Sequence, residues 1–171
     1  TPLGSLLRED HPQSLRAWTI WWGRHLWPVW GHLLHSIRTG QSARKLLSGT
    51  EGFRLLERDP ASAATFYRMT VELTRIAVRQ VLDAYDFKGM RQIVDVGGGH
   101  GELLAHILGA HPAATGILFD LPAAVGGAAE NFRQGHPDLD GRCVFVAGDF
   151  FASVPSGADG YLLKSVLHDW D

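Results

Sequence analysis

The sequence predicts an α/β protein in which an α-helical region precedes a parallel β-sheet. Up to about residue 85, apolar side chains recur at steps of three and four residues, which is the period of an α-helix. From Ile93 onward, short apolar runs alternate with helical stretches, which is typical of parallel strands joined by helices. We therefore divide the chain into a helical region, residues 1–88, and a sheet-forming region, residues 89–171.

The composition is that of a globular domain. The 171 residues are 45% hydrophobic and 20% charged, which is enough apolar material for one core. The single cysteine, Cys143, excludes an intrachain disulfide and a cysteine-rich zinc site, and we expect no metal. No apolar run reaches the length of a membrane span and no signal peptide opens the sequence, so we expect a cytoplasmic protein without membrane contact.

Charge is distributed unevenly along the chain. Residues 1–91 carry 13 Lys and Arg against 8 Asp and Glu, whereas residues 92–171 carry 3 against 10. The acidic half would suit a cationic ligand. The basic residues of the first half are scattered along the predicted helices, so the sequence gives no support for nucleic-acid binding.

The helical region opens with two predicted helices. Asp10 is expected to cap the first, which continues to Ile37, with Pro28 as the residue that breaks or kinks it. Thr50 is expected to cap a second, short helix over residues 51–58. Both helix starts are inferred because the short side chains of Asp and Thr can accept hydrogen bonds from the first backbone N–H groups of a helix.

Five of the six tryptophans lie in the first predicted helix. This is more aromatic surface than one face of a helix can bury in a monomer. We assign Trp18, Trp22 and Trp30 to the core. We expect Trp21 and Trp27 to meet a partner subunit or an aromatic substrate.

A long helix is predicted to begin at Asp59 and to continue to about Tyr85. Arg75 and Arg79 are expected on its solvated face. Its apolar stripe is expected to face the core and comprises Phe66, Met69, Leu73, Ile76, Ala77, Val81 and Leu82.

The stretch 93–101, IVDVGGGHG, predicts the ligand-binding element. A short buried strand runs into a turn almost without side chains, and a helix follows over residues 102–108. Such a turn can take positive φ and lets the backbone approach a nucleotide-like ligand. The dinucleotide fingerprint fails because its third glycine would fall on Glu102 or Leu104, and the phosphate-loop pattern fails as well. A ligand without phosphates, beside the Asp95 carboxylate, fits this turn better.

Three more strands are predicted, over residues 116–119, 143–147 and 160–163, with a helix over residues 123–133. In a doubly wound parallel sheet, the ligand lies across the carboxyl ends of the strands. Chemistry-bearing residues follow each predicted strand. They are the glycine turn, Asp120, Asp149 with Phe150, and the segment from Lys164 to His168.

Each of these residues has a functional and a plain structural explanation. Asp120 lies about 20 residues past the turn, where it would accept from both hydroxyls of a ribose or simply end a strand. Asp149 and Phe150 would bring a carboxylate and an aromatic wall to an adenine, or form an ordinary Gly-Asp turn. Lys164 would line the ligand site or pair with a nearby acid, and His168 is a candidate general base.

Four segments in this order resemble the S-adenosylmethionine-dependent small-molecule O-methyltransferases. They are DVGGG at 95–99, FDLP at 119–122, GDFF at 148–151 and LKSVLHDW at 163–170. This family includes plant caffeate and flavonoid enzymes and bacterial enzymes that methylate aromatic polyketides. Residues 14–18 and 30–34 are similar to the helical region of the bacterial branch. The resemblance implies a Rossmann-like class I methyltransferase sheet, with its first four parallel strands present.

The resemblance also implies roles for the matching positions. The glycine turn would hold the methionine part of S-adenosylmethionine, and His168, in His-Asp-Trp, would deprotonate the acceptor hydroxyl. The family's pocket methionine would fall at Thr70, which here has Met69 beside it. The implied cofactor-binding residues are Asp95, Gly97, Gly99, Gly101, Asp120, Leu121, Asp149, Phe150, Lys164 and Thr74.

The implied activity is methyl transfer to a hydroxyl, of phenolic type, on a small aromatic molecule. The full enzyme is expected to be a homodimer, with residues 1–88 as a helical dimerisation and substrate-lid region. A winged-helix domain would precede this chain, and further strands with the acids that orient His168 would follow it. We therefore expect the chain to represent about half of such an enzyme and not to turn over alone.

Two other classes of function compete with this interpretation. The same fold can serve as a repurposed cofactor-binding domain, or as a non-catalytic interaction module that is inactive because it is truncated. The intact His168, with Asp169 and Trp170 after it, favours catalysis. A nucleic-acid methyltransferase is disfavoured, because the Asn/Asp-Pro-Pro-Tyr/Phe motif of amino-directed enzymes is missing.

Overall fold

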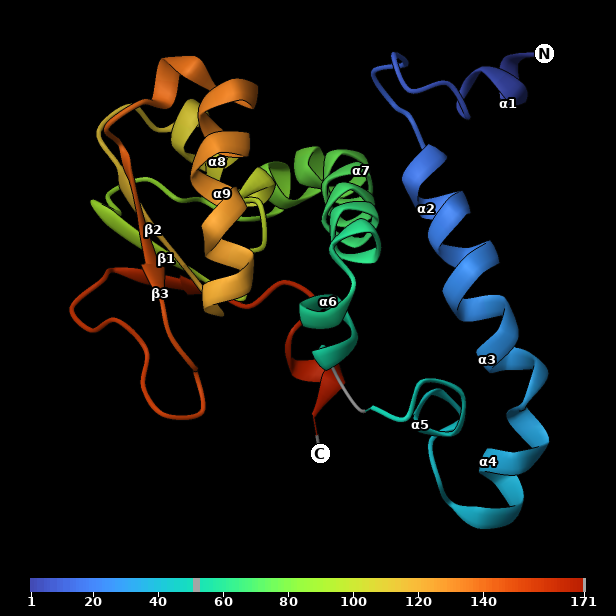
Figure 1. The fold of residues 1–171 in the computed structure, drawn as a ribbon. Helices are drawn as coiled ribbons and strands as arrows, with labels where there is room; N and C mark the ends of the chain where they lie inside the picture. Colours follow the sequence, from blue (N-terminus) through green and yellow to red (C-terminus); the bar gives the residue numbers. More distant parts are fainter. Residues whose placement is uncertain (51–52, 171) are drawn as a thin grey trace. The chain divides into compact units, whose positions relative to one another are not determined.

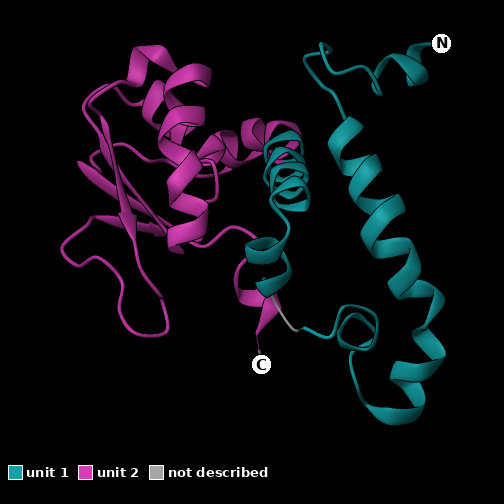
Figure 2. Cartoon of the chain, viewed as in Figure 1, with its two compact units in different colours: residues 1–73 teal, residues 74–171 magenta. Residues whose placement is uncertain are grey.

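The computed structural model describes residues 1–50 and 53–170 of the chain. The chain forms two compact units, Thr1–Leu73 and Thr74–Asp171 (Figure 2). The boundary between them lies inside helix α7, Pro60–Ala84, whereas the sequence-based division placed it after residue 88. The assignment of a dimerisation role to the first region and of cofactor binding to the second stays a prediction.

The first unit is helical, as predicted. Helix α2 begins at Arg16 and not at Asp10, whose carboxylate instead accepts a hydrogen bond from Nε of Arg8 at 2.9 Å. The N-terminus of α2 is capped from α7, because the buried Glu72 carboxylate accepts from the backbone N–H groups of Ala17 and Trp18 at 3.0 and 2.9 Å. The other elements before α7 are α1 Pro2–Ser5, η1 Trp22–Leu26, α3 Trp27–Gly31, α4 Leu33–Thr39, α5 Ala43–Ser48 and α6 Arg54–Arg58.

The predicted break at Pro28 is present as a change of helix type. Element η1 is a π-helical turn, and α3 restarts with Pro28 in its first turn. Proline has no N–H, and its ring clashes with the carbonyl four residues earlier in a regular α-helix. The widened turn, in which the Trp27 N–H bonds to the carbonyl of Trp22, accommodates this constraint.

The burial of the tryptophans corrects two expectations. Trp21 is 4% exposed, packs in a core with Met69 and stacks on His25 with ring centroids 4.1 Å apart. Trp30, expected in the core, is 57% exposed, and Trp27 is 74% exposed. Trp18 and Trp22, which were expected in the core, are partly buried.

The chain between α4 and α7 differs from the prediction in two ways. Helix α5 was not predicted, although Ser42 caps it through its side chain. Helix α6 follows Phe53, which makes no side-chain capping bond, so Thr50 does not cap it. Residues 51–52, at the predicted start of this helix, lie outside the described residues.

Helix α7 begins as predicted, because Oδ1 of Asp59 accepts from the N–H groups of its first turn. Its apolar stripe was wrong at three positions, since Leu73 is 36% and Ile76 50% exposed and Ala77 is exposed as well. Met69 is buried in the first unit and Val78 in the second.

The second unit contains the predicted parallel sheet, in the order β3-β2-β1-β4. Strand β1 pairs in parallel with β2 on one side and with β4 on the other, and β2 pairs with β3. All four predicted strands are confirmed to within one or two residues. The elements are β1 Gln92–Val96, α8 Glu102–Ala110, β2 Thr115–Asp120, α9 Pro122–Gly135, η2 Pro137–Leu139, β3 Cys143–Ala147, β4 Gly160–Leu162 and η3 Leu167–Asp169.

The two faces of the sheet are covered differently. Helices α8 and α9 lie over one face (Figure 1), where Ile93 and Leu118 are fully buried with Leu104, Ile107 and Phe132. The other face carries an apolar cluster of Val94, Val96 and Phe119, against which loop residues pack. The alternation of side chains along β1 and β2 therefore gives each strand two buried faces. Within the described residues, no helix is long and apolar enough to span a lipid bilayer.

Candidate active site

The strand order places the candidate site where the chain changes direction across the sheet. From β1 the chain moves outward through β2 to β3, and then returns to the opposite side of β1 as β4. The carboxyl ends of β1 and β4 thus border the crevice in which α/β sheets bind ligands. The Gly97–Gly101 turn follows β1, and the segment from Lys164 to His168 follows β4.

The glycine turn requires glycine for both conformation and space. Gly97, Gly99 and Gly101 have φ values of 68°, 58° and 77°, which L-residues with side chains rarely adopt. A Cβ atom on Gly98 would lie 2.9 Å from the carboxyl carbon of Asp95. A Cβ on Gly101 would lie 2.7 Å from Leu118, so this last glycine serves helix–sheet packing.

Asp120 is tied directly to the turn. Its Oδ2 accepts from the Gly99 N–H at 2.8 Å, and its Oδ1 accepts from the Leu121 N–H at 2.7 Å. Burial raises the pKa of the Asp120 carboxyl, and these two bonds oppose the shift. The backbone ladder continues past the strand ends, since the Gly97 N–H bonds to the Phe119 carbonyl and the Gly148 N–H to that of Asp120. The structure thus brings the first three strand ends into one row.

Asp95 and Lys164 form an oppositely charged pair beneath this row. Burial raises the pKa of Asp95 to about 7, although the nearby Lys164 opposes the rise and Asp120 adds to it. Burial also lowers the pKa of Lys164, and Asp95 opposes that shift. Both groups are held in a region of low dielectric, where the charge of each favours the charge of the other.

The remaining predicted cofactor residues are placed less directly. The Asp149 side chain accepts from the Phe151 N–H at 2.9 Å and so shapes its own turn. Phe150 is half-buried against the apolar cluster on the face opposite α8. Thr74 is buried on α7, in the same unit as the sheet. Cofactor contacts of these residues stay predictions.

His168 lies in the short helix η3 and is exposed. Its side chain is 68% exposed, and its Nε2 lies 3.3 Å from Oδ1 of Asp169. Ser165, three residues earlier, has a φ of 57°. Within residues 1–50 and 53–170, no other residue except glycine has a positive φ. Such strain is characteristic of functional segments.

Sequence reasoning missed two features of the site. The first is Val166, which is 7% exposed and whose Cγ2 lies 2.9 Å from where a Cβ on Gly97 would be. The second is Glu102, buried at the start of α8, which binds Arg75 at 2.7 Å and so corrects the expectation that Arg75 is merely solvated. His106 and His136 also lie 3.2 and 3.3 Å from its carboxylate. An acid at the first position of a helix was the only available signal for Glu102.

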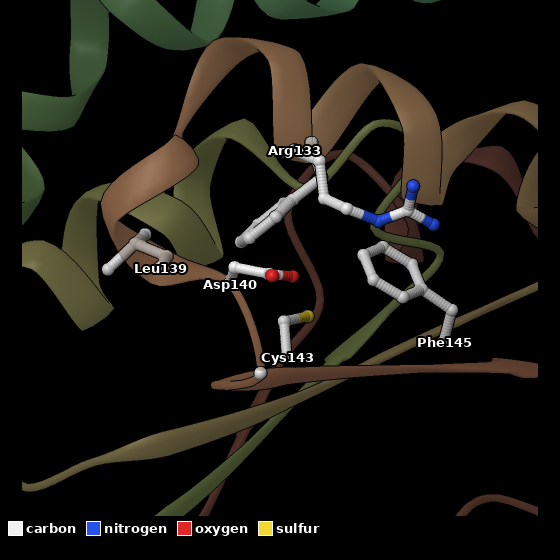
Figure 3. A pocket seen from close by; sticks show the side chains of 7 residues that line it. Arg133, Leu139, Asp140, Cys143 and Phe145 are labelled. Carbon is white, nitrogen blue, oxygen red and sulfur yellow. The ribbon is translucent and has the colours of Figure 1, made fainter.

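The two described cavities lie away from this crevice. One, of about 210 Å³, surrounds Cys143 at the amino end of β3, and Figure 3 shows Arg133, Asp140 and Phe145 around the thiol. Burial raises the pKa of the Cys143 thiol to about 12, so it is protonated and unreactive. The other, of about 490 Å³, is lined by the ends of α8 and α9. Since ligands of such sheets bind at the carboxyl ends, neither cavity is the candidate site.

Comparison with known proteins gives consistent matches. Residues 30–171 match the model of the O-methyltransferase domain. Phenazine O-methyltransferase PhzM from Lysobacter antibioticus is 38% identical over the whole chain, which covers 50% of that protein. The crystal structure of LaPhzM superposes with a TM-score of 0.94 at 38% identity, over 100% of this chain and 51% of the other.

A third match is a solved complex. NcsB1, an O-methyltransferase from neocarzinostatin biosynthesis, was solved with S-adenosyl-L-homocysteine and 1,4-dihydroxy-2-naphthoic acid. It superposes with a TM-score of 0.85 at 36% identity, over 100% of this chain and 52% of the other. The chain spans about half the length of the curated relatives it matches. The sheet order and the glycine turn agree with the family match. The chain therefore belongs to the O-methyltransferase domain family.

Proposed function

We propose that the chain forms the S-adenosylmethionine-binding part of an enzyme that methylates a phenolic hydroxyl of a small aromatic molecule. The observation that carries this proposal is the meeting of three elements at one crevice: the glycine turn, Asp120 and the segment from Lys164 to His168. Family membership supports the reaction type. The complex of NcsB1 with a cofactor product and a dihydroxynaphthoic acid supports the pairing of this cofactor with an aromatic hydroxyl.

The residues of the crevice fit this cofactor. The turn carries no side chains at Gly97 and Gly98, where a Cβ would collide with Val166 and with Asp95. Each carboxylate oxygen of Asp120 accepts one backbone N–H and retains a lone pair for a ribose hydroxyl. Asp95 lies against the turn, and a sulfonium cation bound beside it would favour the charged form of its carboxyl. When bound, S-adenosylmethionine supplies an activated methyl group on a positively charged sulfur.

His168 is proposed as the general base. Moving a proton from a phenol, with a pKa of about 10, to an ordinary imidazole, at about 6.5, is uphill by about 5 kcal/mol. His168 would therefore accept the proton while the phenolic oxygen forms its bond to the methyl carbon and the carbon–sulfur bond breaks. The Asp169 carboxylate, 3.3 Å from Nε2, would stabilise the imidazolium that results.

Cofactor binding is tested by titration calorimetry of the chain with S-adenosylhomocysteine. Asp120→Ala should weaken binding by about 10- to 100-fold, because it removes an acceptor for two hydroxyls. Asp138→Ala, an exposed acid in η2, is the control and should bind as the parent does. A folded parent chain that releases no heat would contradict the proposal.

The catalytic role is tested in the complete protein, by methyl transfer from labelled S-adenosylmethionine to phenolic acceptors. His168→Ala should lower transfer by about 100-fold and leave S-adenosylhomocysteine affinity unchanged. His35→Ala, on α4 in the other unit, is the matched control. Equal transfer by parent and His168→Ala would remove His168 from the mechanism and favour a non-catalytic, cofactor-binding role.

We further propose that the complete protein is a cytoplasmic homodimer of secondary metabolism that pairs through residues 1–88. The exposed apolar side chains of α3 and α4 support this, since Trp27, Trp30 and Ile37 are 74%, 57% and 71% exposed. Sedimentation equilibrium measures the assembly directly, and a monomer at all concentrations would refute it.

A further inference from the structure

The His168 side chain has little to hold it in place. It is 68% exposed, and within the described part of the chain its recorded partner is the carboxylate of the neighbouring Asp169, itself 34% exposed. Exposed pairs of this kind fix a side chain weakly. A general base must nevertheless be held in place to within a fraction of an ångström. Within the described part of the chain, the backbone that carries His168 is therefore what positions it.

Val166 provides that backbone connection. Its carbonyl accepts the Asp169 N–H at 3.1 Å, which closes the short helical turn with His168 at its centre. Its side chain is 7% exposed and lies against the glycine turn, with Cγ2 2.9 Å from the place of a Cβ on Gly97. One residue thus joins the turn that carries the histidine to the turn that faces the cofactor.

Ser165 directs Val166 toward the turn. Its φ of 57° places a side-chain-bearing residue in the left-handed region, which L-residues with a Cβ rarely adopt. Val166 after it packs on Gly97, and Lys164 before it follows strand β4, which pairs with β1. The strained residue therefore lies between a strand that pairs with β1 and a side chain that packs on the turn after β1. Strain of this kind persists only where its surroundings fix the conformation.

We propose that Val166 is a positioning residue, whose packing on Gly97 sets the distance between the His168 imidazole and the sulfonium of bound S-adenosylmethionine. This inference rests on the proposed function. It assigns the alignment of the two turns to an aliphatic side chain. This side chain touches neither the proton that His168 would accept nor the methyl group that is transferred. The glycine at position 97 then has a second purpose, because it makes room for Val166 as well as for the cofactor.

The experiment compares NMR spectra of the parent chain and its variants with S-adenosylmethionine and with S-adenosylhomocysteine. The two ligands differ in the charge on sulfur, so the difference between the His168 ring shifts that they induce reports the distance from sulfonium to imidazole. Val166→Ala should reduce this difference at least about twofold. Its affinity for S-adenosylhomocysteine should change by less than about threefold, because the residue binds no cofactor atom. Val144→Ala, the same substitution at a 59% exposed side chain on β3, is the matched control.

A second variant keeps the test valid if Val166→Ala unfolds. Val166→Ile retains the contact with a larger side chain, and Ser165→Gly retains positive φ without strain. Both should keep the parent's response to the sulfonium charge to within about twofold. An unchanged response in a folded Val166→Ala variant would overturn the inference while leaving the proposed function intact. A parent chain that binds neither ligand would overturn the proposed function and this inference with it.

Discussion

At the scale of single residues, the site depends on side chains in unusual surroundings. Asp95 is 2% exposed beneath the glycine turn, and burial raises its pKa to about 7, against about 3.9 in an unfolded chain. A raised pKa means that folding favours the protonated form. The contribution of Asp95 to stability is therefore fully present below about pH 4 and is lost as pH rises toward 7.

Asp95→Asn should remove this dependence on pH. A neutral amide of similar size avoids the cost of a buried charge, so the variant should be more stable than the parent at pH 8, by at most about 4 kcal/mol. Urea unfolding of both proteins between pH 5 and pH 8 measures the effect. Glu130→Gln, an exposed acid on α9, is the control and should follow the parent. Parallel curves for parent and Asp95→Asn would show that Asp95 is ionised throughout.

At the scale of elements, two buried glutamates link helices that the sequence does not connect. Glu72 on α7 caps α2, and Glu102 joins the start of α8 to Arg75 and to two histidines. Burial alone would raise the pKa of Glu102, but hydrogen bonds from His136 and Arg75 outweigh it and lower the pKa to about 2. A lowered pKa gives stability that is present above about pH 4.5 and lost as pH falls toward 2.

Glu102→Gln should therefore destabilise the second unit at pH 7. The loss should be about 2–3 kcal/mol, because the side chain is 8% exposed and its three partners lose a charged acceptor. The difference from the parent should shrink as pH falls below about 4.5 and should disappear only near pH 2, where the native carboxylate becomes protonated. Thermal unfolding at pH 7 and pH 2 measures both points. Loss of the exposed Glu130 carboxylate by Glu130→Gln should cost less than about 0.5 kcal/mol, and an equal cost for both variants would contradict this assignment.

These elements also show what the sequence could and could not reveal. The strands were predictable because period, length and flanking turns agree locally, and the glycine turn and Asp120 follow from their places at strand ends. The start of α2 was not predictable, because Glu72 caps it from a helix that is distant in the sequence. The local sequence had instead indicated Asp10 as the cap. Which tryptophan is buried depends on the helix face that packs against Phe66 and Met69, a contact between segments far apart in the sequence. Val166 carries no polar signal, and its contact with Gly97 exists only once β4 lies beside β1.

At the scale of the whole molecule, the two units differ in how their stability is built. The second has a sheet whose inner strands β1 and β2 are paired on both sides, whereas β3 and β4 lie at its edges. The first consists of short helices, and no helix before α7 in residues 1–50 and 53–59 exceeds seven residues. Short helices depend on tertiary packing for their stability.

Hydrogen exchange should therefore rank the elements. The amides of β1 and β2 should exchange slowest, through opening of the entire second unit, and those of β4 and of α3 to α5 should exchange fastest. Mass spectrometry of exchanged peptides measures the order. Addition of S-adenosylhomocysteine should slow exchange most in peptides that contain the glycine turn. Protection of β4 equal to that of β1 would contradict this ranking.

The order of the strands along the chain has a consequence for how the site is assembled. Val94 pairs with Ile117 in β2 across a short connection, but with Tyr161 in β4 only after the chain has passed through α9 and β3. The entropy lost in closing a loop grows with its length, so the nearer pairing is expected to form first. The bond between Gly99 and Asp120 belongs to that early pairing, whereas the contact of Val166 with Gly97 belongs to the late one. During synthesis and refolding, a folding intermediate should already contain the glycine turn with its bond to Asp120, while the segment from Lys164 to His168 is still unfolded.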